Sequence, residues 1–170
     1  LSLREPGGTP FGEKMRDVLK HPGSAIQPAA EALLFAACRA QLVADVIAPA
    51  LASGQVVICD RFIDSTVAYQ AGGRGLDRAL IESANRLACG GVRPDLTILL
   101  DLDPSRGLGR ASVRDHGQAD RFEVRNGTGR CLEHSYDPWA DRGPVLGWFA
   151  YATFPDGRAQ WETLSVAEAE

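Results

Sequence analysis

Two short apolar runs without a polar break predict two buried strands. The first, Val56 to Cys59, ends at the charged pair Asp60–Arg61, and the second, Leu96 to Leu100, ends at Asp101. Runs of this kind are typical of strands covered on both faces of a parallel sheet. The opening residues 1–3 are interpreted as the end of a third strand whose beginning is missing, which predicts that the chain is a fragment.

Helical periodicity separates the predicted strands. A helix should begin after the cap Thr9 with Pro10 and end near Pro22. Another should run from Pro28 to about Ser53, with Pro49 kinking or tightening its last turns. A third should follow the cap Asp77 and stop at Gly90. The predicted core faces of the three helices are, in order, Phe11, Met15, Val18 and Leu19; Leu34, Cys38, Leu42 and Ile47 or Val46; and Leu80, Ile81, Ala84, Leu87 and Ala88.

Alternating strands and helices predict an α/β fold with right-handed crossovers, in a chain long enough for one domain. The net charge of −4 does not suggest nucleic acid or a membrane as a partner. The sequence contains no run of about 18 apolar residues, so no transmembrane helix is predicted, and no signal peptide is recognisable. The four cysteines lack a CxxC spacing, which favours free thiols in a reducing compartment over a zinc site.

Arginines gather between residues 105 and 123, where three glycines disfavour a rigid helix. This segment is interpreted either as a mobile cationic flap or as a solvated charged helix. Residues 124–170 differ from the rest: they hold all three tryptophans and lack a clear pattern, although Leu146 to Ala152 could form a strand.

The stretch after Cys59 carries the strongest signs of chemistry. Ligands of open parallel sheets bind at the carboxyl ends of strands, where Asp60 and Arg61 stand. A helical segment with polar side chains follows, and then a glycine-rich loop that contains Arg74. On the long helix Phe35 and Arg39 are four residues apart, so they share a face.

Five motifs, in this order and spacing, strongly resemble bacterial thymidylate kinase. They are the REPGGT stretch at 4–9, LLFAACR at 33–39, DRFIDSTVAYQ at 60–70, RPDLT at 93–97, and the pair GLGR at 107–110 with DRFE at 120–123. The resemblance covers residues 1–123, with a lid at about 105–121, and leaves 124–170 as a divergent, unassigned tail. It implies a three-layer P-loop nucleoside monophosphate kinase fold with a parallel sheet, here incomplete.

The resemblance also implies an activity: phosphorylation of dTMP to dTDP with ATP and Mg²⁺, in the cytoplasm and by a homodimer. Phosphoryl transfer depends on positioning and charge neutralisation, for which arginine forks are well suited. The resemblance implies a role for each site residue. Around the base and sugar, Phe35 stacks on thymine, Arg39 hydrogen-bonds the base edge, Thr66 and Gln70 line the pocket, Tyr69 closes the wall near the sugar, and Glu5 lies on the sugar–phosphate side.

Around the phosphates, the resemblance implies that Arg61 and Arg16 hold the dTMP phosphate, that Asp60 lies by the magnesium and its waters, that Arg110 and Arg114 belong to the lid, and that Arg74 is a further candidate phosphate contact.

Two departures from the family pattern lead to further expectations. The ATP-cradling motif G-x-x-x-x-G-K-[ST] is absent, and the family's first strand, which would stand between the strands at Val56 and Leu96, is missing with it. We therefore expect a gap in the sheet and a chain that is poorly folded and inactive as a kinase. The alternatives are a non-catalytic thymidylate-binding remnant and the product of a truncated or frameshifted gene. A deoxynucleoside kinase is the alternative among enzymes, but the arginines of the monophosphate site argue against it.

Overall fold

A computed structural model describes residues 1–102 and 146–153 of the chain. Its elements, in chain order, are β1 (Ser2–Arg4), α1 (Pro10–Lys20), α2 (Pro28–Leu42), the π-helical segment η1 (Val43–Ile47), α3 (Ala48–Ala52), β2 (Val57–Asp60), α4 (Ile63–Thr66), the π-helical segment η2 (Val67–Gly73), α5 (Arg78–Cys89), β3 (Leu96–Leu102) and β4 (Leu146–Thr153). The α/β architecture is confirmed.

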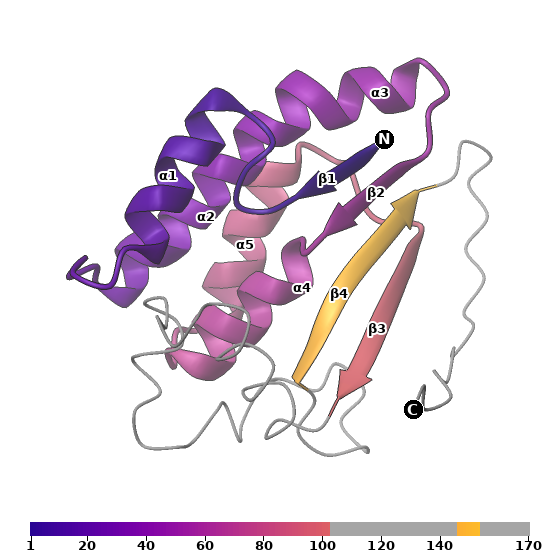
Figure 1. The fold of residues 1–170 in the computed structure, drawn as a ribbon. Helices are drawn as coiled ribbons and strands as arrows, with labels where there is room; N and C mark the ends of the chain where they lie inside the picture. Colours follow the sequence, from indigo (N-terminus) through magenta and orange to yellow (C-terminus); the bar gives the residue numbers. More distant parts are fainter. Residues whose placement is uncertain (103–145, 154–170) are drawn as a thin grey trace, which may run out of the picture.

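The four strands form one sheet in the order β1-β2-β4-β3 (Figure 1). β1 pairs with β2 in parallel, and β4 pairs antiparallel with both β2 and β3. β1, β2 and β3 therefore run in the same direction, as the α/β pattern predicts. The expected gap between β2 and β3 is not seen in this structure, because the tail strand β4 lies there with reversed direction.

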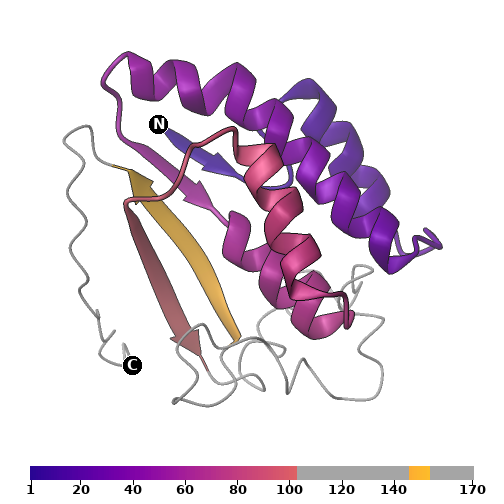
Figure 2. The same ribbon diagram turned by 180° about the vertical axis from the view of Figure 1, so that it is seen from behind.

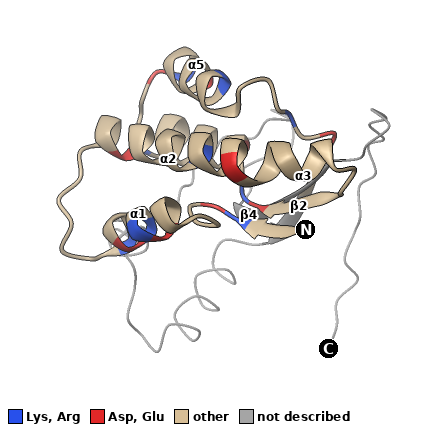
Figure 3. Ribbon diagram, turned by 90° about the horizontal axis from the view of Figure 1, so that it is seen from above, with Lys and Arg blue, Asp and Glu red and all other residues tan. Residues whose placement is uncertain are grey.

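Helices cover one face of this sheet. The run from α2 to α3 and helix α5 lie over the same face in two views (Figures 2 and 3), and no helix of the described residues lies over the other. In β2 the side chains of Val57 and Cys59 are buried, whereas Ile58 is 48% exposed. The prediction that this strand is buried on both faces is therefore wrong within residues 1–102 and 146–153.

The inward faces of α1 and α5 also differ from the prediction. On α5 the buried residues are Ile81, Asn85, Ala88 and Cys89, while Leu80 and Leu87 are 71% and 85% exposed. The face is rotated because the polar Asn85 points inward to a buried partner described below. On α1 only Leu19 of the predicted apolar face is buried, and Phe11 and Val18 are exposed.

The long central helix is confirmed, with Cys38, Leu42 and Ile47 in the core. Near Pro49 the helix widens into the π-helical turn η1, although the pattern predicted a kink or a tighter turn. Proline has no N–H to donate to the carbonyl four residues earlier, and a wider turn is one way to accommodate that loss.

By length and composition alone, the helix from Pro28 to Ala52, with a mean hydropathy of 1.5, could cross a membrane. Its inward side, however, carries the buried charges of Glu31 and Arg39, and it packs against α1 and α5. Charged groups that are paired inside a helical layer are typical of a core helix.

Three of the four cysteines are free and buried, as predicted; Cys131 lies outside the described residues. Burial raises the pKa of Cys38 and of Cys89 to about 11, and that of Cys59 higher still. Since the thiolate is the reactive form, these side chains behave as small core residues.

Candidate functional site

The carboxyl ends of β1 and β2 bring two distant motifs together. Arg4 pairs with Asp60 across the parallel ladder, and the Glu5 amide donates a 2.9 Å hydrogen bond to the Asp60 carbonyl. The next residue, Arg61, has φ +68°, which is uncommon for a side chain other than glycine and is found often at functional sites. Its guanidinium lies 5.1 Å from the centre of the Tyr69 ring, within cation–π range.

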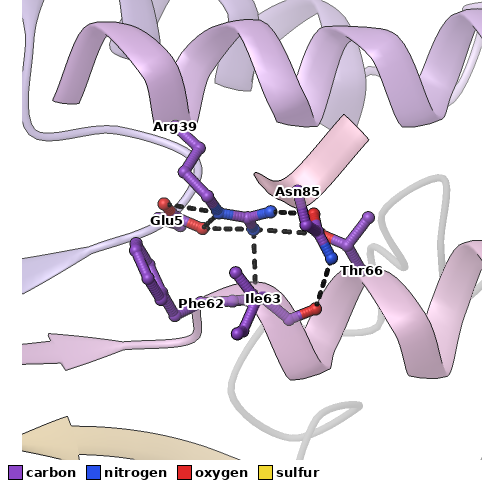
Figure 4. Close-up of polar contacts among 6 residues, drawn as sticks. All are labelled: Glu5, Arg39, Phe62, Ile63, Thr66 and Asn85. Atoms are coloured by element: carbon purple, nitrogen blue, oxygen red, sulfur yellow. Dashed lines mark hydrogen bonds and ion pairs between the residues drawn. The ribbon is translucent and has the colours of Figure 1, made fainter. Parts of the chain in front are cut away.

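Arg39 is the centre of a buried polar network (Figure 4). Its Nη2 donates to Glu5 Oε2 at 2.6 Å and its Nε donates to both Glu5 oxygens at 3.0 and 3.1 Å. Nη2 also donates to the Phe62 carbonyl at 3.0 Å and to Thr66 Oγ1 at 2.9 Å. Nη1 donates to Asn85 Oδ1 at 2.6 Å. The side chain, 1% exposed, thus joins the loop after β1 to α2, α4 and α5 through one guanidinium.

Asn85 was not predicted as a site residue. Its Oδ1 accepts from Arg39, and its Nδ2 donates to the Ile63 carbonyl at 3.3 Å, which ties α5 to the start of α4 (Figure 4). The available signal was a single asparagine in an apolar helical face, which composition alone does not separate from a surface position.

The carboxyl of Glu5 is held between two opposing effects. Burial raises its pKa above the ordinary value of 4.5, while the adjacent Arg39 guanidinium acts in the opposite direction. The net direction is upward, because a carboxylate loses more from desolvation than one partner returns.

This shift predicts a pH dependence of stability. A carboxyl whose pKa is raised in the folded state binds its proton more tightly there than in the unfolded chain. The free energy of unfolding should therefore fall as the pH rises from about 4.5 through the folded pKa of Glu5, and then level off. Urea unfolding of the wild type and of Glu5→Gln at a series of pH values measures the difference. A difference that grows with pH in favour of the wild type would contradict the shift.

A second buried carboxylate, Glu31 on α2, organises the segment after α4. Its Oε1 accepts from Gln70 Nε2 at 2.8 Å and from Arg74 Nε at 3.1 Å, and its side chain is fully buried. Sequence reasoning missed Glu31, although a signal exists: it precedes Phe35 and Arg39 by four and eight residues, so the three share one face of the helix. The partners of this face come from one segment: Thr66 accepts from Arg39, and Gln70, four residues after Thr66, donates to Glu31.

The loop from Glu5 to Thr9 is fastened to α1. Thr9 Oγ1 accepts from the Gly12 amide at 2.9 Å, which confirms the predicted cap. Arg16 Nη1 donates to the Pro6 carbonyl at 2.9 Å. The Gly8 amide donates to Glu13 Oε1, and this bond lowers the pKa of the exposed Glu13 carboxyl.

The structure therefore gathers seven of the predicted site residues into three groups. Glu5, Arg39 and Thr66 share one network, Gln70 and Arg74 contact Glu31, and Arg61 lies over Tyr69. Phe35 is half-buried on α2, and Asp60 is exposed at the carboxyl end of β2. Arg110 and Arg114 lie outside the described residues.

Among residues 1–102 and 146–153, no cluster of three or more His, Cys, Asp or Glu side chains could hold a metal ion. Asp60 offers one exposed carboxylate at the carboxyl end of β2. A single carboxylate is compatible with Mg²⁺, which keeps several waters and is commonly held by one or two carboxylates together with substrate phosphates.

Comparisons with known proteins point to one family. The family model described as thymidylate kinase matches residues 1–136. The chain is 56% identical over 123 residues to a thymidylate kinase of Synechococcus sp. (strain JA-2-3B'a(2-13)), covering 72% of this chain and 59% of that protein. It is 55% identical over 123 residues to the thymidylate kinase of Geobacter sulfurreducens, covering 72% and 58%.

A solved structure of thymidylate kinase from Ehrlichia chaffeensis superposes with a TM-score of 0.57 and 35% identity, over 69% of this chain and 68% of that one. The chain spans about three fifths of the length of the curated relatives named above. The strand β4 lies beyond the residues that the family model matches. Five motifs in order, the α/β fold and these matches together show that the chain belongs to the thymidylate kinase family.

Proposed function

We propose that this chain provides the thymidylate-binding part of a kinase that transfers the γ-phosphate of ATP to dTMP. Two observations together support this proposal best. The chain belongs to the thymidylate kinase family, and Arg39 binds both Glu5 and Thr66 one helical turn after Phe35. A flat pyrimidine needs an aromatic platform and a few edge hydrogen bonds, and the α2–η2 face offers both.

The base pocket is proposed to lie between α2 and the segment from α4 to η2. Phe35 stacks on the thymine ring, Thr66 and Gln70 line the pocket, and Tyr69 closes the sugar side. Arg39 reads the base edge while it holds Glu5, which remains on the sugar–phosphate side. Because the Nε and Nη2 atoms of Arg39 already donate to protein acceptors, direct bonding from these atoms would require an exchange of partners.

The phosphate end is proposed to lie at the carboxyl ends of β1 and β2. Arg61 and Arg16 neutralise the dTMP phosphate, Asp60 orients magnesium through its waters, and Arg74 is a further candidate contact. Arg110 and Arg114 are proposed to close over the transferring phosphate as lid residues. Arginines that arrive on closure neutralise the charge of the transition state and exclude water.

Transfer itself needs a cradle for the ATP phosphates, and the motif G-x-x-x-x-G-K-[ST] does not occur in these 170 residues. We therefore propose that the 170-residue chain binds dTMP and has little kinase activity by itself. The cytoplasm is the proposed location. Dimerisation through the helix Pro28–Ala52 is the proposed assembly.

Calorimetry with the 170-residue chain tests the pocket. We expect dTMP to bind, and Phe35→Ala to weaken it about tenfold or more, since stacking of a base on an aromatic ring contributes about 1–3 kcal/mol. Leu33→Ala is the matched control, because Leu33 is on the same helix, 64% exposed, and outside the proposed pocket.

Two further measurements distinguish the proposed function from its alternatives. Thymidine without its phosphate should bind much more weakly than dTMP if Arg61 and Arg16 hold the phosphate, whereas equal binding would favour a nucleoside kinase. Formation of dTDP from dTMP and MgATP by the 170-residue chain would contradict the proposed lack of activity. If dTMP does not bind to a folded wild-type chain, the pocket itself is wrong.

A further inference from the structure

Glu31 is a buried charge to which the proposed function assigns no role. It lies in the first turn of α2, one helical turn before Phe35, and no part of its side chain is exposed. Its charge is compensated by Arg74, whose Nε and Nη2 donate to Oε1 and Oε2 at 3.1 and 3.4 Å. An ionised carboxylate can only accept hydrogen bonds, so every group that faces it must be a donor.

This requirement determines how the Gln70 amide is oriented. Gln70 is 1% exposed, and its Nε2 donates to Glu31 at 2.8 Å. The reversed amide would place its carbonyl oxygen against the carboxylate, which is repulsive. The Oε1 atom is therefore directed away from the Glu31 carboxylate.

We propose that Glu31 is a positioning residue that sets the base preference of the pocket by fixing the Gln70 amide with its acceptor oxygen available to the ligand. This inference rests on the proposed pocket between α2 and η2. In that pocket, an acceptor at Gln70 suits a pyrimidine with an imide N–H, such as thymine or uracil. Cytosine presents a ring nitrogen acceptor at the same place, so two acceptors would face each other.

Glu31→Gln separates orientation from size. The new amide has a single oxygen, which Arg74 attracts, so its NH₂ group is left to face Gln70. Gln70 must then turn its own oxygen toward residue 31 and present NH₂ to the ligand. We expect the ratio of the dTMP affinity to the dCMP affinity to fall by about tenfold, which corresponds to the loss of about one hydrogen bond. The preference between dTMP and dUMP should not change, because both bases carry the imide.

The test is calorimetric binding of dTMP, dUMP and dCMP to the 170-residue chain and its variants, with thermal unfolding of each. Glu82→Gln is the matched control: it makes the same chemical change in an exposed ion pair with Arg78 and should leave all three affinities unchanged. A general loss of structure would weaken the three nucleotides together, whereas the proposal requires a change in the dTMP-to-dCMP ratio.

A second variant keeps the test decisive if Glu31→Gln unfolds. Gln70→Met removes the acceptor and leaves the Glu31–Arg74 ion pair in place, and it should lower the same ratio. On the Gln70→Met background, Glu31→Gln should change the ratio no further, because Glu31 acts through Gln70. If the dTMP-to-dCMP ratio does not change in Gln70→Met, or in a folded Glu31→Gln, the role of Glu31 is overturned while the proposed pocket stands. A wild-type chain that binds none of the nucleotides would overturn the proposed pocket, and this inference with it.

Discussion

Replacement of Arg39 by methionine is expected to lower the free energy of unfolding by about 3–5 kcal/mol. Methionine fills a similar volume but removes the cation that compensates the buried Glu5 carboxylate. It also removes the arginine donors to Thr66 Oγ1 and Asn85 Oδ1, two oxygens of buried side chains. Urea unfolding followed by tryptophan fluorescence and circular dichroism measures the loss.

The double variant Glu5→Gln/Arg39→Met distinguishes charge from packing. If the uncompensated carboxylate dominates, the double variant should be more stable than Arg39→Met, since no unpaired charge is left inside. Arg39→Lys should fall between the wild type and Arg39→Met, because lysine keeps the charge but not the planar fork. A double variant less stable than Arg39→Met would show that the charge is not the main term.

Replacement of Leu42 by alanine is expected to cost about 2–5 kcal/mol. Leu42 is completely buried in the cluster that joins the central helix to β2, together with Val43, Ile47 and Val57. Truncation loses transfer free energy and leaves a cavity that the surrounding helix and strand fill only in part. The midpoint of urea unfolding should fall while the slope stays the same.

Gly8 provides a matched partner for this variant. A Cβ built at Gly8 would lie 2.7 Å from Leu42 Cδ1, and its φ of +75° is strained for any side chain by about 1–2 kcal/mol. Gly8→Ala should therefore destabilise the chain through both strain and overlap. In Gly8→Ala/Leu42→Ala the overlap is absent, so the combined loss should be smaller than the sum of the two single losses. A strictly additive result would show that the Leu42 side chain moves aside without cost.

Much of the site was predictable, because its motifs are local. Asp60 and Arg61 follow an unbroken apolar run, which places them at the carboxyl end of a strand. Phe35 and Arg39 share a face through their spacing alone. Glu31 and Asn85 were missed for a common reason: each is a polar residue on an inward face, and its burial depends on a partner that lies 39 to 46 residues away in the chain.

The sequence by itself determined the local structure. Thr9 and Asp77 cap their helices through short-range hydrogen bonds, Gly90 ends α5 in the left-handed region, and apolar runs form strands. These features depend on neighbours within about four residues, so their signals are in the chain order. Family membership could be inferred from motif order in the same way.

Tertiary structure alone decided which faces are buried and which strand lies in the centre of the sheet. Arg39 attracts Asn85 inward and turns Leu80 and Leu87 to the outside, although their apolar character predicted the reverse. β4, from a tail without a clear pattern, lies between β2 and β3. A buried charge must be compensated and a strand must find pairing partners wherever they lie in the chain, and local periodicity identifies neither partner.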